Sequence, residues 1–500
     1  MNNVLLVHVP SQRIKDDSPP FPLGLLYVGR ILESLGKRVK VIDLYLYDFP
    51  ADDKWGYLTL KNIIDDFHPD IIGYGGIATS YVWTKGLSVN VKKDYSDIIQ
   101  IAGSALSSVY DLLLNKAKID VVFHGEVENS LPAFIERLDN GKSWADVPGI
   151  SYLSSNEIKK TPPAMQIMNL DDIPFPAYHL IDMKKYFRSM KYKLGIYKKD
   201  LVDQGLYESI AKRLENVEFI LPMATSRGCT HRCLFCYRHV KGYRKYSVGY
   251  LIRHIKYVKE RFGIDGFSFC DELFNGNTKW IYEFCDEIDK NKLKIFYGTS
   301  ARADNVSEDM LRRMSETGCY HLLYGQESGS DTILKEYSKG ITRKQNLDAT
   351  LLTRKAGIYS TVQLVIGSPG ETRQTIQETI DFLKEVGVQY YSLNYLIPFP
   401  ETPIWQYVLE NNLISDVEAY LEQVVVMPGS PVVNLTKVPD KEWKNWADLI
   451  KYKTSLHHLK SRGSYKGLLQ AVAKYQLKRI LPEKIKRFIS RSIEGVRGKM

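Results

Sequence analysis

Three cysteines with metal-ligand spacing lie near the middle of the chain, at Cys229, Cys233 and Cys236, in the segment RGCTHRCLFCY. Thiolates spaced Cys-x3-Cys-x2-Cys can each bind one iron of a four-iron, four-sulfur cluster, which normally takes four cysteines. One iron is then left open for another ligand. The alternative is a zinc knuckle or ribbon, for which His231 or His239 would supply the fourth ligand.

The other cysteines, Cys270, Cys285 and Cys319, are scattered through predicted strands and helices. We expect buried packing thiols at these three positions. Six cysteines in 500 residues are too sparse for a disulfide scaffold. The chain also shows no signal peptide and no apolar run of the roughly 20 residues that span a membrane. These features predict a cytoplasmic protein.

The cysteine segment follows the first strand of a series in which strands and helices alternate. The predicted strands are residues 219–224, 266–269, 294–299, 321–324, 360–366 and 389–393. The predicted helices are residues 250–261, 277–290, 307–317, 342–356 and 372–386. A closed eight-unit barrel needs roughly 250 residues, more than this segment has. The series therefore predicts a partial (β/α)6 barrel over residues 218–415, with the cysteines at the carboxyl end of its first strand.

The cysteine spacing, Phe235 before the last cysteine and the position after a strand resemble the radical S-adenosylmethionine superfamily. This resemblance covers residues 219–405. It implies that S-adenosylmethionine binds the open iron of a [4Fe-4S] cluster and is cleaved reductively to methionine and a 5′-deoxyadenosyl radical. The resemblance also implies cofactor contacts at the ends of successive strands. The matching residues here are Asp271 and Glu272 for the amino group, Arg302 for the carboxylate, Glu327 and Ser328 for the ribose, and Gly367 for the adenosyl group.

Residues 1–145 also alternate between strand and helix, which predicts a doubly wound, flavodoxin-like (Rossmann-like) parallel sheet. The predicted strands are residues 4–9, 39–44, 71–75, 99–102 and 121–124, and the predicted helices are 23–35, 83–93, 107–114 and 129–138. Residues 146–217 contain several prolines that break any long helix, so we interpret them as a connector.

The motifs PFPLGLLY, VID, PDIIG, GEVENSL and DIPFPAY resemble the cobalamin-binding module that precedes the radical domain in one large subgroup. The resemblance implies a bound cobalamin. We assign its nucleotide tail to two loops that contain Gly75, Gly76 and Thr79, and Gly103 and Ser104, since small residues and hydroxyls permit close approach to a phosphate. The Asp-x-His-x-x-Gly signature of a cobalt-binding histidine is absent. His8 is interpreted as a packed histidine, and we expect no protein histidine on cobalt. The alternative is a flavodoxin-like domain that has lost its cofactor.

The net charge of +10 is concentrated in the last 50 residues, which carry 14 Lys and Arg against two Glu. The other 450 residues therefore sum to about −2, so the sequence gives little support for nucleic-acid binding. Residues 416–500 are expected to be helical. The basic, amphipathic stretch from Leu477 to Ile493 is compatible with peripheral contact with an anionic membrane or with a helix that packs on the barrel.

The leading hypothesis is a cobalamin-dependent radical enzyme that methylates an unactivated carbon. One alternative keeps both cofactors but catalyses a cyclisation, oxidation or rearrangement. Another is a non-catalytic iron–sulfur electron carrier, against which the polar residues at the strand ends argue. A small molecule or a lipid precursor is compatible as substrate, with flavodoxin or ferredoxin as electron donor.

Overall fold

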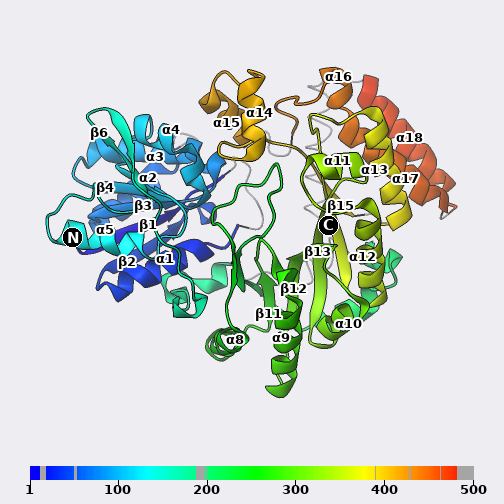
Figure 1. Ribbon diagram of the computed structural model, residues 1–500, viewed down its shortest axis with the longest axis horizontal. Helices are drawn as coiled ribbons and strands as arrows, with labels where there is room; N and C mark the ends of the chain where they lie inside the picture. The colour runs from blue at the N-terminus through cyan, green and yellow to red at the C-terminus, as the bar shows by residue number, and fades with distance from the viewer. Residues whose placement is uncertain are drawn as a thin grey trace.

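The structure is a computed structural model that describes residues 1–11, 19–49, 53, 55–186, 198, 200–388, 390–426, 430–461 and 463–480. It contains a first domain built on one sheet, a barrel built on a second sheet, and helices after the barrel (Figure 1). None of the helices in these residues combines the length and apolar character that a membrane crossing requires.

The first domain contains a seven-stranded sheet in the order β2-β1-β3-β4-β5-β6-β7. Its strands are β1 Asn3–His8, β2 Arg38–Asp43, β3 Ile71–Gly75, β4 Ile99–Gly103, β5 Val121–Phe123, β6 Ile150–Ser154 and β7 Glu157–Lys160. The first five strands are parallel. Their order, 2-1-3-4-5, is that of the flavodoxin-like fold and confirms the predicted architecture.

Helices cover both faces of this sheet, which explains why its strands are continuous apolar runs. The helices are α1 Leu23–Ser34, α2 Tyr57–Phe67, α3 Tyr81–Asp94, α4 Tyr110–Asn115 and α5 Ser130–Asp139. Successive side chains of β1 point to opposite faces. Val4 and Leu6 therefore share a core with α1 and α5, whereas Leu5 and Val7 share one with α2, α3 and α4.

The sheet continues past the predicted boundary at residue 145. Strands β6 and β7 form an antiparallel hairpin that pairs with β5. The sequence prediction missed this hairpin for two reasons. Residues 146–217 are rich in proline, and β7 is short and largely polar.

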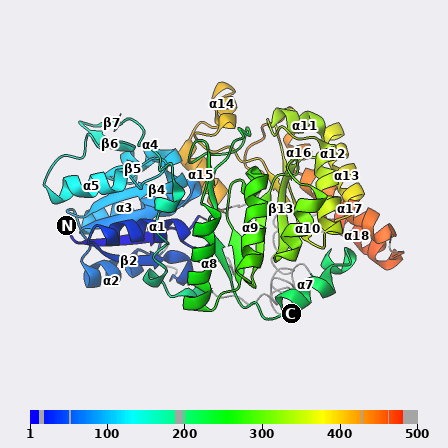
Figure 2. The same ribbon diagram turned by 60° about the horizontal axis from the view of Figure 1, so that its bottom comes forward.

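The rest of the connector lies between the first domain and the barrel. Phe175 stacks on His254 of α8 (Val248–Phe262), with ring centroids 4.2 Å apart, and its carbonyl accepts a hydrogen bond from Arg30 of α1. The Tyr178 hydroxyl lies 3.0 Å from His254 Nε2. Figure 2 shows α8 on the side of the barrel that faces the first domain. The DIPFPAY motif therefore joins the two sheets through their covering helices.

The second sheet has six parallel strands in the order β8-β11-β12-β13-β14-β15, which confirms the partial barrel. Its strands are β8 Ile220–Met223, β11 Gly266–Phe269, β12 Phe296–Ala301, β13 Cys319–Glu327, β14 Tyr359–Ile366 and β15 Tyr391–Tyr395. Besides α8, its helices are α9 Thr278–Lys290, α10 Glu308–Glu316, α11 Asp331–Glu336, α12 Arg343–Lys355 and α13 Arg373–Val386, with α7 Tyr207–Leu214 before the first strand.

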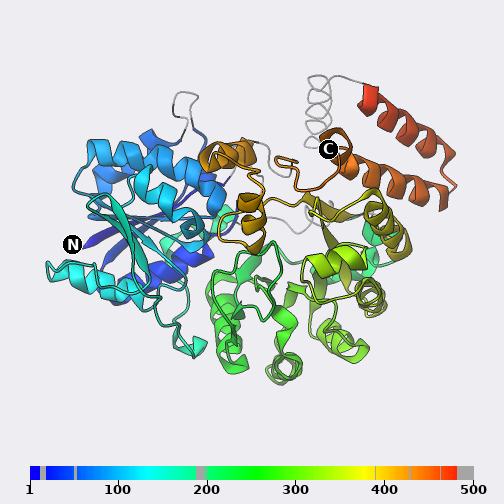
Figure 3. The ribbon, with the colours of Figure 1, turned by 45° about the horizontal axis from the view of Figure 1, so that its top comes forward.

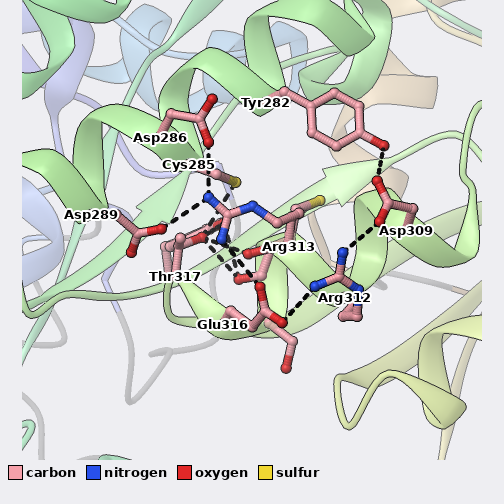
Figure 4. Close-up of polar contacts among 12 residues, drawn as sticks. Tyr282, Cys285, Asp286, Asp289, Asp309, Arg312, Arg313, Glu316 and Thr317 are labelled. Atoms are coloured by element: carbon pink, nitrogen blue, oxygen red, sulfur yellow. Dashed lines mark hydrogen bonds and ion pairs between the residues drawn. The ribbon is translucent and has the colours of Figure 1, made fainter.

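A polar network joins α9 to α10 on the outside of the barrel (Figure 4). Arg313 donates hydrogen bonds of 2.9 Å to both Asp286 and Asp289. Thr317 lies 3.3 Å from the thiol of Cys285. Cys285 and Cys319 are buried, as expected for packing thiols, whereas Cys270 is exposed, so the expectation for Cys270 is wrong. Cys270 comes directly after β11, where the chain leaves the core.

The chain after the barrel returns to the first domain (Figure 3). Its helices are α14 Pro403–Glu410, α15 Val417–Val426, α16 Asp440–Trp443, α17 Trp446–Ser461 and α18 Tyr465–Ile480. Glu418 of α15 accepts hydrogen bonds from Tyr81 (2.7 Å), Lys85 (2.6 Å) and Lys116 (2.8 Å) of the first domain. The α17 helix packs against α13 of the barrel. The predicted basic helix after Ile480 lies outside the described residues.

Candidate functional site: a cavity beside a cysteine loop

The three predicted cluster ligands lie in the loop of a hairpin. Strands β9 (Ser226–Gly228) and β10 (Tyr243–Lys245) are antiparallel, and residues 229–242 connect them. We refer to residues 229–242 as the cysteine loop. The sequence prediction located its position after β8 but missed the hairpin, since each strand has only three residues.

Contacts on both sides fix the cysteine loop. The Leu234 amide donates a hydrogen bond of 2.9 Å to the Tyr337 carbonyl. The Phe235 ring packs edge-on against the Tyr337 ring, with the ring centroids 5.2 Å apart. On the other side, the Tyr237 hydroxyl lies 3.2 Å from the Ser107 hydroxyl of the first domain. The loop is therefore held between the barrel and the first domain.

The thiols of the loop are accessible to a ligand, since Cys229 and Cys233 are half-buried and Cys236 is exposed. Partial burial raises the pKa of the Cys233 thiol, whereas the cationic Lys339 and Arg302 act to lower it. Among the described residues, no three cysteine, histidine or acidic side chains converge closely enough to hold one metal ion. The thiolates of a four-iron cluster bind different irons, so they do not need to converge on one point.

Charged side chains at the barrel edge pair with one another near the cysteine loop. Glu327 accepts a hydrogen bond from Lys339 Nζ at 2.9 Å, and it has a left-handed backbone with φ of +62°. Arg302 donates to both carboxylate oxygens of Asp304 (2.9 and 2.7 Å) and to the Lys339 carbonyl (2.8 Å). The structure therefore brings Arg302 and Glu327 together through Lys339. Sequence reasoning missed Lys339, because it follows a helix and not a strand.

Asp271 and Glu272 occupy different environments although they are adjacent. The buried Asp271 carboxylate accepts hydrogen bonds from the amides of Thr225 (2.7 Å) and Ser226 (2.8 Å) and from the Thr225 hydroxyl. These bonds commit Asp271 to the link between β8 and the cysteine loop, so its assignment to an amino group is not supported. Glu272 lines a cavity, and burial together with the charge of Asp271 raises the pKa of its carboxyl group.

Ser328 and Gly367 both lie at the barrel edge, in different surroundings. The Ser328 hydroxyl is buried and lies 3.2 Å from the Thr379 hydroxyl, so it is used inside the protein. Gly367 has φ of +95°, and its amide donates to the fully buried Glu371. A side chain at Gly367 would be strained, which agrees with the backbone role predicted for this residue.

A cavity of about 480 Å³ lies at the carboxyl edge of the first sheet and reaches the cysteine loop. From the first domain it is lined by backbone and small residues that include four of the predicted ligands, Gly75, Gly76, Gly103 and Ser104. From the barrel side it is lined by Arg227, Gly228, His239, Cys270 and Glu272. Thr79, which was also predicted, is buried in the turn Ala78–Ser80 and does not line the cavity.

The inner part of this cavity is apolar. It lies between the sheet and helices α1 and α5, and is lined by Leu6, Val28, Ile31, Ile101, Phe123 and Leu131. Gly73 on β3 also lines this part. A side chain there would displace Leu6, because its Cβ would lie 2.9 Å from Leu6 Cδ2. The cavity therefore suits a ligand with an apolar group at one end and polar groups at the other.

Some buried polar atoms of cavity-lining residues have no hydrogen-bond partner among the described residues. They include Oε2 of Glu128 and Nδ1 of His239. Burial lowers the pKa of His239, so its ring is neutral near pH 7. Buried polar atoms usually have partners. A corrin ring carries amide side chains that could supply them, and these residues therefore fit a corrinoid.

His8 lies at the end of β1 and also lines the cavity. Its Nδ1 atom is 3.0 Å from the Asp43 carboxylate, which accepts a further hydrogen bond from Tyr186 at 2.6 Å. His8 is thus paired with Asp43 and is not only a packing residue. The expected absence of a histidine ligand to cobalt stays a prediction.

Comparison with known proteins supports this architecture. Residues 223–383 match the model of the Radical SAM superfamily. An uncharacterized methyltransferase of Pyrococcus horikoshii is 29% identical over 421 residues, which cover 82% of this chain and 84% of that protein. The cytidylyl-2-hydroxyethylphosphonate methyltransferase of Streptomyces wedmorensis is 24% identical over 484 residues, which cover 85% of this chain and 86% of that protein.

One similar solved structure is that of the radical S-adenosylmethionine methyltransferase TsrM from Kitasatospora setae, with cobalamin and a [4Fe-4S] cluster bound. It has a TM-score of 0.63 at 19% identity, covering 82% of this chain and 75% of that chain. The likeness extends over both sheets, so the two proteins share their fold. Residues 223–383 therefore form a domain of the Radical SAM superfamily, and the chain shares its fold with the cobalamin-bound structure of TsrM.

Proposed function

We propose that this protein cleaves S-adenosylmethionine reductively at a [4Fe-4S] cluster held by Cys229, Cys233 and Cys236, and that it is a cobalamin-dependent methyltransferase acting on an unactivated carbon. The observation that carries the proposal is the shared cavity: residues of the first domain and of the cysteine loop line one space. Two cofactors bound there would lie next to each other. The methyltransferase names of the relatives support the choice of reaction.

The barrel edge offers complementary charges for S-adenosylmethionine. Arg302 and Lys339 are cations suited to its carboxylate, and Glu327 is an acceptor suited to its ribose hydroxyls or its amino group. Because these side chains are already paired, binding would exchange partners and would not leave a buried charge alone. Among the described residues, none donates a hydrogen bond to the Glu272 carboxylate as Thr225 and Ser226 do to Asp271, so Glu272 replaces Asp271 as our candidate for the amino group.

The cavity of the first domain would hold cobalamin, which supplies a methyl carrier when bound. The apolar part between α1 and α5 would take its flat nucleotide base, and Gly75, Gly76 and Gly103 would allow the corrin to approach the backbone. Glu128 and His239 would accept or donate hydrogen bonds at its rim. The substrate, a small molecule or a lipid precursor, and the electron donor, flavodoxin or ferredoxin, remain part of the proposal.

The test uses protein reconstituted anaerobically with iron and sulfide and then supplied with cobalamin. With dithionite and S-adenosylmethionine, we expect the wild type to release 5′-deoxyadenosine and Cys233→Ala to release none. Once a substrate is found, label from the S-adenosylmethionine methyl group should appear in the product. Product without label would favour cyclisation, oxidation or rearrangement. Absence of 5′-deoxyadenosine from the wild type would reject the proposal.

A further inference from the structure

Two arginines stand at the base of the cysteine loop. Arg227 on β9 and Arg244 on β10 are directly opposite each other in the antiparallel pair. Like charges in this position repel each other and weaken a hairpin. Both side chains are largely buried, with 17% and 10% of their surface exposed, so water screens the repulsion poorly.

Two carboxylates from the other domain compensate for the charge of the arginines, and one of them contacts both. Glu126, in the loop after β5, accepts hydrogen bonds from Arg244 Nη1 (3.0 Å) and Nη2 (2.7 Å) and from Arg227 Nη1 (3.2 Å). Glu128 of the same loop lies 2.6 Å from Arg227 Nη2. These two glutamates and two arginines form a buried group with no net charge, and we refer to it as the interdomain clamp.

The interdomain clamp also borders the cavity. Glu126, Glu128 and Arg227 line it, as does Gly125, whose φ of +70° sets the turn of the loop. Arg227 is two residues from Cys229 in the sequence. The same few side chains therefore touch the space proposed for a corrinoid and fix the strand that directly precedes the first cluster ligand.

We propose that Glu126 is a positioning residue that couples the two cofactor sites: occupancy of the cavity by cobalamin fixes the 124–129 loop, and through the interdomain clamp this fixes the cysteine loop for S-adenosylmethionine. Coupling of this kind is reciprocal, so each ligand tightens the binding of the other by the same factor. The inference rests on the proposed function, because it requires both cofactors to bind.

The experiment measures the dissociation constant of S-adenosylmethionine with the cluster-loaded protein, with and without saturating hydroxocobalamin. For the wild type we expect cobalamin to tighten binding by about tenfold. We define the coupling ratio as the dissociation constant without cobalamin divided by that with cobalamin. In Glu126→Gln, which keeps the shape of the side chain but removes the charge shared by the arginines, this ratio should fall to near one. The electron paramagnetic resonance spectrum of the reduced cluster should likewise change on adding cobalamin in the wild type and not in the variant.

Glu418→Gln is the matched control, because it breaks another set of interdomain ion pairs that do not border the cavity. Its ratio should equal that of the wild type. If Glu126→Gln fails to load a cluster, Arg244→Lys serves in its place. This variant keeps the charge but loses the bidentate hydrogen bond to Glu126, so it should also lower the ratio. A wild-type ratio of one, or an unchanged ratio in the variants, overturns the inference. If the wild type binds no cobalamin at all, the proposed function itself fails.

Discussion

At the barrel edge, ionisable side chains are paired with one another, whereas the cavity of the first domain is lined mainly by glycine backbone and apolar side chains. Lys339 joins Glu327 to Arg302 in the first region. In the second, Gly75 and Gly76 line the cavity together with Leu6 and Ile31. The first arrangement suits a small charged ligand, and the second suits a large ligand recognised mainly by its shape.

This difference indicates how each region should respond to substitution. Paired charges tolerate the loss of one partner poorly, because the other is left buried without compensation. A cavity lined by glycine is instead blocked by added volume. The two regions meet at the cysteine loop, so substitutions there should separate the two binding functions.

The largest effect is expected for the cysteines. Cys229→Ala, Cys233→Ala and Cys236→Ala should each abolish the cluster absorbance of the reconstituted protein, because a cubane needs all three thiolates. Corrinoid retention should survive, since the cavity walls are intact. Cys270→Ala is the control, because Cys270 lines the cavity beside the loop. Loss of the cluster in that variant would contradict the assignment.

Glu371 should make the stability of the protein depend on pH, because it is a buried acid that, among the described residues, has no cationic partner like that of Glu327. Burial raises the pKa of this carboxyl group to about 8 from an ordinary value of 4.5. The folded state therefore keeps a proton that the unfolded chain loses, so stability should fall as pH rises from about 4.5 to 8, by up to about 1.4 kcal/mol per pH unit.

Glu371→Gln cannot ionise and should flatten this slope. The measurement compares melting temperatures at pH 5.5 and pH 8 for the wild type, Glu371→Gln and the control Glu336→Gln, an acid that accepts from the nearby Gly370 amide. Equal slopes in the wild type and Glu371→Gln would show that Glu371 is ionised throughout.

Glu327→Ala tests whether the paired charges bind S-adenosylmethionine. We expect weaker binding by roughly 1.5 to 3 kcal/mol, the scale of a hydrogen bond to a charged group. Ser328→Ala should have a smaller effect, because its hydroxyl is committed to Thr379. Titration of the cluster-loaded proteins measures both, and Glu327→Gln shows whether loss of charge or of the side chain matters. Unchanged affinity would remove Glu327 from the site.

The smallest effect is expected at α15, whose Glu418 does not line the cavity. Hydrogen bonds from Lys116, Lys85 and Tyr81 outweigh partial burial and lower the pKa of Glu418 to about 2. Its contribution to stability is therefore present above pH 4.5 and is lost as pH falls towards 2. Because the lysines are partly exposed, Glu418→Gln should cost about 1 kcal/mol or less at pH 7. A larger loss in denaturant unfolding would show that α15 holds the domains together.

Much of the fold could be predicted because apolar runs and their spacing encode the two parallel sheets. Strands β1, β3 and β11 fall within a residue of their predicted bounds. The hairpins β6–β7 and β9–β10 were missed, since three to five residues of mixed polarity carry no period that identifies a strand. The cysteines could be found because the spacing of metal ligands is local in sequence.

The partners within the site could not be predicted in the same way. Asp271 and Glu272 look equivalent in sequence. In the structure, however, Asp271 accepts hydrogen bonds from backbone amides, whereas Glu272 lines the cavity. Likewise, Lys339 and Arg244 become site residues only through long-range pairing with Glu327 and Glu126. The first pairing depends on how the barrel folds and the second on how the two domains meet, and no periodicity in the sequence records either.

The central claim is that the cavity of the first domain holds a cobalamin next to the cysteine loop. The most direct test is retention of hydroxocobalamin after gel filtration by the wild type and by Gly103→Phe. A Cβ at Gly103 meets nothing nearer than Phe123 Cβ at 3.7 Å, so the change should fill the cavity with little strain elsewhere. We predict stoichiometric corrinoid on the wild type and almost none on a folded Gly103→Phe. A colourless wild type, or equal retention by both proteins, would contradict the account.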